Sequence, residues 1–280
     1  MDAPIVFTMM RHAPSPAASG MIERIVGYRE TATGIFRQRE TASLVVPLII
    51  SLGSPFSIAL GREPGVEDRQ PSFAAGLYAG PVNIESDGAA ECIQVDFTPL
   101  GAYRFFGGAV GDLAARMVDI EDVLGRDGGR LRQLLGETTS WQRRFELVED
   151  FVLRRATRQP SPEIIFAYSR LANTNGTMRV SGLAGEIGWS RRHFIRRFKN
   201  EIGVAPKTVA RMMRFHRACS DACFAPNAGW AEIAIGAGYA DQAHLVREFA
   251  ELAGETPGVW ARRMSLTDRR LLEERYGAGE

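Results

Sequence analysis

Apolar residues follow two different patterns along the 280 residues of the chain. In the first hundred residues they form short, partly β-branched runs that Gly and Pro interrupt, a pattern that indicates strands. The last run alternates, with Ile93, Val95 and Phe97 on one side and Gln94 and Asp96 on the other, as in a half-buried strand. The expected strands are residues 44–52 and 56–60, joined by residues 53–55, and residues 73–78 and 92–97.

After Pro99 the apolar residues recur at intervals of three and four, which predicts helices. Phe145, Val148 and Val152, for example, form one apolar stripe. Two prolines in residues 158–162 bar a continuous helix, so this segment is the expected boundary between two domains. The helices expected before it are 100–106, 118–124, 131–135 and 141–156. The seven expected after it are about 163–173, 181–188, 190–201, 206–223, 229–237, 240–252 and 256–265.

One pattern occurs twice among these seven helices. Residues 180–198 and 230–249 each combine a short helix, a turn with glycine and a second helix carrying His-apolar-X-Arg-X-Phe. Ser181, Ser190 and Asp241 are expected to cap three of these helices at their N-termini. This arrangement is typical of the helix-turn-helix, whose second helix reads DNA in the major groove. Two copies in tandem predict a protein that contacts two stretches of duplex DNA.

The net charge of +1 conceals an uneven distribution. Ten Lys and Arg residues lie within residues 179–217, where only Glu186 and Glu201 oppose them. Residues 221–263 are acidic, with three bases against six acids. A concentrated basic segment favours phosphate binding, and its few acids argue against neutralisation by internal ion pairs. The first copy is therefore expected to supply most of the electrostatic attraction to DNA.

The helical spacing of the two second helices separates an inner side from an outer side. Phe194 and Phe198 share one face and are expected in the core, as are Leu245 and Phe249 in the second copy. Arginine can bind guanine with two hydrogen bonds, glutamine suits adenine, and Ile195 can contact a thymine methyl group. The residues expected to contact DNA are Ser190, Arg191, Arg192, Ile195 and Arg196 in the first copy, and Gln242, Ala243, Val246 and Arg247 in the second.

These motifs resemble the C-terminal DNA-binding domain of the AraC/XylS family of transcriptional regulators. Residues 233–249, followed by residues 254–260, are similar to the family's signature almost position for position, and the first copy with residues 203–206 echoes it. The chain departs from the signature at Arg197, where an apolar residue is usual, and at Ala243, where a small polar one is usual. The resemblance implies a seven-helix, double helix-turn-helix domain whose second helices lie in successive major-groove segments.

The N-terminal region is similar to a sensor-like domain that precedes this DNA-binding unit in some family members. The similar stretches are residues 27–29, the strands around Pro47, Gly80–Pro81 and residues 97–101. The resemblance implies control by a small effector or by dimerisation. Since His12 is the only histidine before the boundary segment, no cluster of metal-binding histidines is expected there, and no cofactor is predicted.

We therefore expect an α+β protein, with a β-rich, barrel-like sensor or dimerisation domain and trailing helices at 1–157, a linker at 158–162, the all-α DNA-binding domain at 163–265 and a tail at 266–280. A cytoplasmic location is expected, because the odd count of three cysteines fits a reducing compartment and no signal peptide or membrane-length run is present. A regulator of transcription is favoured over an enzyme, because the sequence shows no recognisable reactive Cys in a proline-rich context, zinc-binding cysteines or catalytic Asp beside a hairpin. The alternative is an enzymatic, DNA-repair-like domain fused to a DNA-binding one. Expected partners are double-stranded DNA and a small effector, with RNA polymerase and a second copy of the chain as further candidates.

Overall fold

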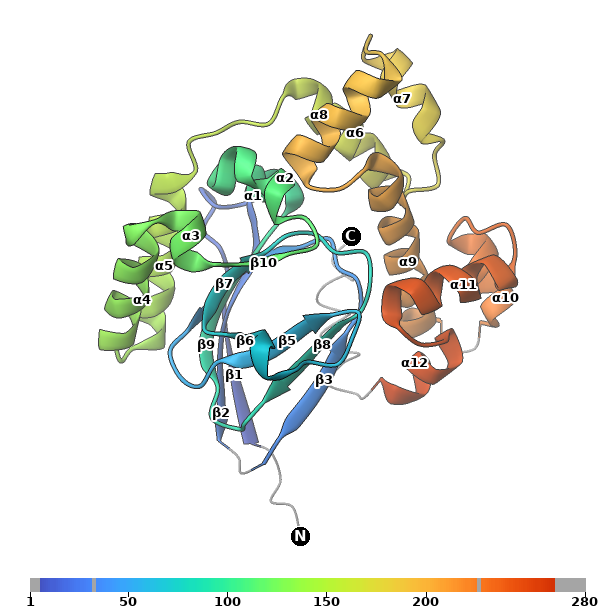
Figure 1. Cartoon of the computed structure of the whole chain (residues 1–280). Coiled ribbons are helices and arrows are strands. Elements are labelled where there is room, and N and C mark those ends of the chain that lie inside the picture. The colour runs from blue at the N-terminus through green and yellow to red at the C-terminus, as the bar shows by residue number, and fades with distance from the viewer. Residues whose placement is uncertain (1–5, 32–33, 226–227, 265–280) are drawn as a thin grey trace.

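A computed structural model describes residues 6–31, 34–225 and 228–264 of the chain. Strands dominate the first hundred residues and helices dominate the remainder (Figure 1). The predicted α+β class, a β-rich N-terminal domain followed by helices, is confirmed. The tail expected at 266–280 lies outside the described residues. Within the described residues, no helix combines the length and apolar character needed to cross a bilayer.

Two antiparallel sheets face each other in the N-terminal domain (Figure 1). Among the described residues, the larger sheet has six strands, in the spatial order β1 (Val6–His12), β2 (Ile22–Thr31), β9 (Glu91–Phe97), β4 (Val46–Ser51), β7 (Ser72–Ala75) and β10 (Met117–Asp119). The smaller sheet has four, in the order β3 (Phe36–Glu40), β8 (Val82–Ser86), β5 (Phe56–Leu60) and β6 (Arg69–Gln70). A short 3₁₀-helix, Val66–Asp68, precedes β6.

Both faces of the larger sheet are covered. One face, with Ile93, Val95 and Phe97, packs on helices that follow the strands, and the other packs on the smaller sheet through residues such as Ile49 and Phe56. The alternation predicted for this strand is correct, but neither side faces water. Asp96, expected on an open side, is fully buried because the chain covers that side and supplies a cation, Arg24, at 2.5 Å.

Four strands predicted from sequence, at 44–52, 56–60, 73–78 and 92–97, correspond to β4, β5, β7 and β9. β4 and β5 lie in different sheets, since residues 53–55 carry the chain from one sheet to the other. The helix predicted at 118–124 begins only at Ile120, because residues 117–119 form β10 and pair with β7. That pairing depends on a strand more than forty positions away, so local periodicity could not reveal it.

Five α-helices follow in the N-terminal half of the described chain: α1 (Pro99–Phe106), α2 (Val110–Leu113), α3 (Ile120–Leu124), α4 (Arg126–Glu137) and α5 (Trp141–Arg155), with a 3₁₀-turn at Gly107–Ala109. Their apolar stripes cover the larger sheet. In α5 the stripe is Phe145, Val148 and Val152, as predicted, and each of these residues is buried. The contact between α5 and the sheet includes a hydrogen bond between His12 of β1 and Glu149 of α5. The His12 Nε2 atom lies 2.8 Å from the carboxylate of Glu149.

The described C-terminal region contains the seven predicted helices, which are α6 (Pro162–Asn173), α7 (Val180–Glu186), α8 (Arg191–Ile202), α9 (Pro206–Phe224), α10 (Trp230–Gly236), α11 (Gln242–Ala253) and α12 (Pro257–Arg263). Pro162, Pro206 and Pro257 each stand in a first turn, where a missing N–H costs nothing. The cap predicted at Ser181 is wrong. Helix α7 begins one residue earlier, which puts Arg179 at its N-cap and Ser181 inside the helix.

The long helix α9 runs from the group α6–α8 to the group α10–α12 (Figure 1). We call α7–α8 the first reader unit and α10–α11 the second reader unit. The first unit shares one continuous apolar core with the N-terminal domain, and Phe194 and Phe198 belong to this core. The second unit has a separate core around Leu245 and Phe249, which one residue of the N-terminal domain, Ala42, enters.

Candidate nucleic-acid interface

Each reader unit turns sharply at a glycine. Gly188 and Gly238 have φ of +70° and +81°, a left-handed conformation that side chains disfavour. A Cβ on Gly238 would also lie 2.4 Å from Thr177 Cγ2. Each turn is closed by a backbone hydrogen bond, from Trp189 N–H to Ala184 O at 2.9 Å and from Tyr239 N–H to Ala234 O at 2.8 Å. The two units therefore share one backbone design.

The second helix of each unit begins at a side-chain cap. Ser190 Oγ accepts a hydrogen bond from His193 N–H at 3.3 Å, and Asp241 Oδ1 accepts one from His244 N–H at 2.7 Å. Both caps were predicted from the sequence. Because the cap satisfies an N–H that the helix cannot, it fixes where α8 and α11 begin and thus which residues occupy their first turns.

Aromatic residues hold the inner side of both helices. Phe194 and Phe198 pack edge to face in α8, with ring centroids 5.6 Å apart. In α11, Phe249 meets Phe215 of α9 at 4.9 Å and Trp260 of α12 at 5.5 Å. Both predicted core pairs are buried, since Phe194, Phe198, Leu245 and Phe249 are each at most 1% exposed. This packing leaves the opposite sides of α8 and α11 outward.

The outward positions repeat between the units. Residues 191, 192, 195 and 196 of α8 and residues 242, 243, 246 and 247 of α11 follow the same spacing, which places each set on one side of its helix. The predicted residues that are exposed are Ser190, Arg191, Arg192, Arg196, Gln242, Ala243 and Arg247, and those that are half-buried are Ile195 and Val246. The structure thus brings the predicted residues together on two helix surfaces, and their contact with DNA stays a prediction.

The basic segment is partly neutralised by the second unit, contrary to expectation. Arg211 of α9 binds Glu248 at 2.9 Å and also Glu251, and Arg214 binds Glu248 at 3.4 Å. The sequence could not predict this ion pair, because Arg211 and Glu248 lie 37 positions apart. Three of the bases remaining around α7 and α8 are Arg179, Arg191 and Lys207, which line a cleft of about 420 Å³ beside α8. Positive charge therefore gathers at the first unit.

Arg197, where the sequence departs from the family signature, belongs to a buried network. Its guanidinium lies 2.6 Å from Glu201, whose side chain is 1% exposed. Glu201 in turn accepts hydrogen bonds from the backbone N–H and the hydroxyl of Ser161, both at 2.7 Å. Ser161 precedes α6, so this network joins the segment between the two domains to the first unit. Sequence reasoning missed this network, because Ser161 and Glu201 lie 40 positions apart.

The cysteines offer little to an enzymatic alternative. Burial, together with the nearby carboxylates Glu30 and Glu91, raises the pKa of Cys92 to about 12. Burial also raises the pKa of Cys219 well above its usual value. A thiol acts as a nucleophile only when it ionises, so neither residue is prepared for that chemistry. Over the ranges 6–31, 34–225 and 228–264, no group of His, Cys, Asp or Glu could hold a metal ion.

Two capped helices, each backed by phenylalanine and exposing residues at matched positions, define a double helix-turn-helix DNA-binding domain. Residues 183–263 match the family model described as a helix-turn-helix domain. Residues 183–263 therefore form an AraC-type helix-turn-helix domain, as the motifs predicted. A comparison with curated proteins gives no significant match.

Solved structures with a similar arrangement include ToxT from Vibrio cholerae. It is 10% identical, with a TM-score of 0.43 over 92% of this chain and 98% of that one. ToxT from the same organism with an unsaturated fatty acid bound is 9% identical, with a TM-score of 0.38 over 93% and 96% of the two chains. The AraC-like transcriptional activator CuxR is 14% identical, with a TM-score of 0.29 over 77% and 87%.

Proposed function

We propose that this regulator reads two successive major-groove segments, one with α8 and one with α11. The proposed contacts are Ser190, Arg191, Arg192, Ile195, Arg196, Gln242, Ala243, Val246 and Arg247. The observation that carries the proposal is the repeated outward spacing of these residues on two helices with capped, outward-facing first turns. Such first turns are the part of a recognition helix that reaches base edges.

The helices α8 and α11 would contribute differently to DNA binding. Three arginines stand on the outward side of α8, and Arg179 and Lys207 lie beside it, so the first unit suits guanine contacts and phosphate attraction. On α11 only Arg247 is basic among the proposed contacts, and Gln242 suits adenine. The second unit would therefore add selectivity with little electrostatic attraction.

Selection of bound duplexes from random DNA, with the full-length chain, tests this proposal. We expect an enriched motif of two segments about one helical turn, roughly 10 base pairs, apart. Arg192→Ala and Arg247→Ala should each relax base preference in a different segment. Arg130→Ala is the matched control, since its side chain is 78% exposed on α4, away from both units. No enriched motif, or two variants that alter the same segment, would contradict the proposal.

We further propose that residues 1–157 form a sensor domain that responds to a small effector, followed by a linker at 158–162 and the DNA-binding domain at 163–265. The resemblance of residues 27–29 and 97–101 to a sensor-like domain of some family members supports a sensing role. Dimerisation through this domain and contact with RNA polymerase stay predictions. Gel filtration with light scattering, with and without operator DNA, tests whether the protein dimerises.

A further inference from the structure

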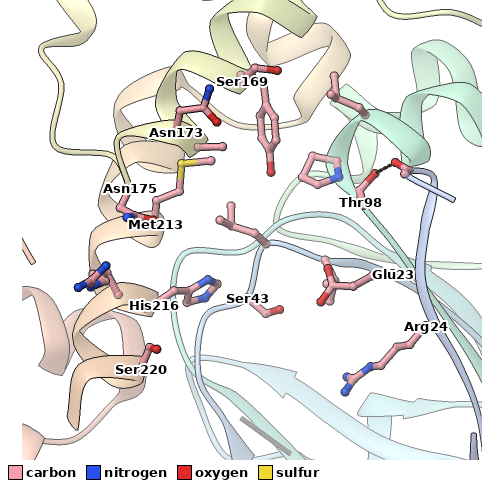
Figure 2. A pocket seen from close by; sticks show the side chains of 18 of the residues that line it. Glu23, Arg24, Ser43, Thr98, Ser169, Asn173, Asn175, Met213, His216 and Ser220 are labelled. Atoms are coloured by element: carbon pink, nitrogen blue, oxygen red, sulfur yellow. Dashed lines mark hydrogen bonds between the residues drawn. The ribbon is translucent and has the colours of Figure 1, made fainter. Parts of the chain in front are cut away.

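A large cavity lies where the N-terminal domain meets the DNA-binding helices. Its volume is about 730 Å³, within the range of small-molecule sites. One wall consists of β1, β2, residues 43–45 and the start of α1, and the other consists of α6 and α9 (Figure 2). A molecule bound there would touch both parts of the protein at once.

The charged groups around this cavity are already satisfied. Arg24 binds Asp96 at 2.5 Å and Arg217 binds Asp221 at 2.7 Å. The other charged or titratable lining residues, Arg11, Glu23 and His216, also have partners within the chain. Burial, and secondarily the charge of Glu23, raises the pKa of Tyr168, so this phenol stays neutral at physiological pH. None of these charged groups therefore lacks a partner within the chain.

Neutral hydroxyl and amide groups supply the rest of the polar lining. They are Ser43 and Thr98 on the N-terminal side and Ser169, Asn173, Asn175 and Ser220 on α6, α9 and the residues after α6. Leu44, Leu100 and Met213 add apolar surface between them. This mixture suits a molecule whose own polar groups are uncharged.

Ser43 points most directly to a ligand. Its hydroxyl oxygen is buried and has no hydrogen-bond partner among the described residues. A buried hydroxyl without a partner is unfavourable, so such a group in a native protein calls for water or a ligand. Figure 2 shows Ser43 on the N-terminal wall, between the side chains of His216 and Glu23.

The segment that carries Ser43 also holds the second reader unit. The neighbouring Ala42 donates its N–H to Leu252 O of α11 at 2.8 Å, and its carbonyl accepts a hydrogen bond from His216 Nε2 of α9 at 2.9 Å. Ala42 is 1% exposed within the core of that unit. A displacement of the segment around Ala42 and Ser43 would therefore also displace α11, because Ala42 is hydrogen-bonded to it.

We propose that this cavity binds a small, neutral metabolite rich in hydroxyl or amide groups, that the metabolite bonds to Ser43, and that its binding changes the DNA affinity of the second unit. The inference rests on the proposed control by an effector, and it names the site and the chemistry of that effector. Ser43 also lines an apolar cavity between the sheets, but that cavity, of about 100 Å³, is smaller than the usual small-molecule site, so we assign the ligand to the domain junction.

The test uses a fixed panel of neutral sugars, polyols, nucleosides and amides, with carboxylates of matched size, against the full chain by ligand-observed NMR. We expect at least one neutral compound to bind and no carboxylate to bind better. Ala172→Trp, on the exposed rim of the cavity, should weaken that binding at least tenfold. Leu134→Trp, a substitution to the same residue on α4, should not. If no neutral compound binds, or if Ala172→Trp binds it as the wild type does, the inference is wrong.

Ser43→Ala sharpens the test without filling the cavity. Loss of one neutral hydrogen bond should weaken the compound's affinity by roughly fivefold to tenfold. The melting temperature of the free protein should not fall, because the hydroxyl has no protein partner to lose. Equal affinity of Ser43→Ala and wild type would overturn the assignment to Ser43.

The bound compound should also change DNA affinity, mainly at the segment read by α11 in a footprint. Unchanged DNA affinity at saturating compound would overturn the regulatory half of the proposal. Sequence-specific DNA binding by the chain without any compound distinguishes these failures from failure of the proposed function.

Discussion

The two reader units share one frame and differ in chemistry. When His193 is aligned with His244, each residue of α8 has a counterpart 51 positions later in α11. The phenylalanine anchors and the capped starts coincide, whereas the outward Arg191 and Arg192 become Gln242 and Ala243. The backbone design thus constrains the inner side, while the outer side is free to specialise.

The same count pairs Arg197 with Glu248, two residues of opposite charge. Each forms ion pairs to a buried or half-buried partner, Arg197 with Glu201 and Glu248 with Arg211 and Arg214. In this chain, the corresponding positions of α8 and α11 thus both carry an ion-paired residue, and the two residues have opposite charge. The two reader units also contact the N-terminal domain in different ways. The first unit shares an apolar core with that domain, whereas the second unit has its own core, which Ala42 of that domain enters.

The largest expected effects concern the shared frame. Phe198→Ala and Phe249→Ala should each lower the free energy of unfolding by about 3–5 kcal/mol, because each removes a fully buried ring. Denaturant unfolding measures both. A loss below about 1 kcal/mol in only one variant would show that the two anchors are not equivalent.

The buried ion pairs come next. Glu248→Gln should cost about 2–3 kcal/mol, because it leaves Arg214, whose side chain is 16% exposed, without its countercharge. Glu201→Gln should cost a similar amount, and it alone should loosen the segment around Ser161. Denaturant unfolding, with hydrogen exchange at residues 158–162, separates the two outcomes.

Substitutions of the proposed base-contacting residues should differ more between the two reader units, in their effect on DNA affinity, than the stability substitutions above do. Arg196→Ala should weaken operator binding by about 1–3 kcal/mol, and Arg247→Ala by about 1 kcal/mol or less, because the first unit concentrates the positive charge. Titration of labelled operator at fixed salt measures both losses. The reverse order would refute the proposed difference between α8 and α11.

The smallest effect is electrostatic. Lys207→Ala should reduce the slope of log affinity against log salt by about 1, and should weaken binding equally for all sequences, as expected of a phosphate contact. Arg130→Ala, which also removes one positive charge, should leave the slope unchanged. An unchanged slope in Lys207→Ala would remove the cleft beside α8 from the proposed interface.

The sequence predicted the C-terminal region well because its information is local. Apolar spacing, prolines in first turns and the caps Ser190 and Asp241 act within a few residues, and all seven helices followed from them. What depends on distant residues was missed. Residues 117–119 form a strand only because β7 lies beside them, and Arg211 is neutralised by residues of α11. The orphan hydroxyl of Ser43 is likewise invisible until the two walls of the cavity are in place.

Helix α9 has 19 residues and so measures about 28 Å end to end. A continuous helix of this length does not stretch, so it fixes the separation and the angular phase of the two surfaces it connects. Insertion of one base pair between the two read segments would rotate one relative to the other by roughly 35° about the DNA axis. A promoter recognised by this protein should therefore tolerate base changes within either segment far better than a change in the number of bases between them.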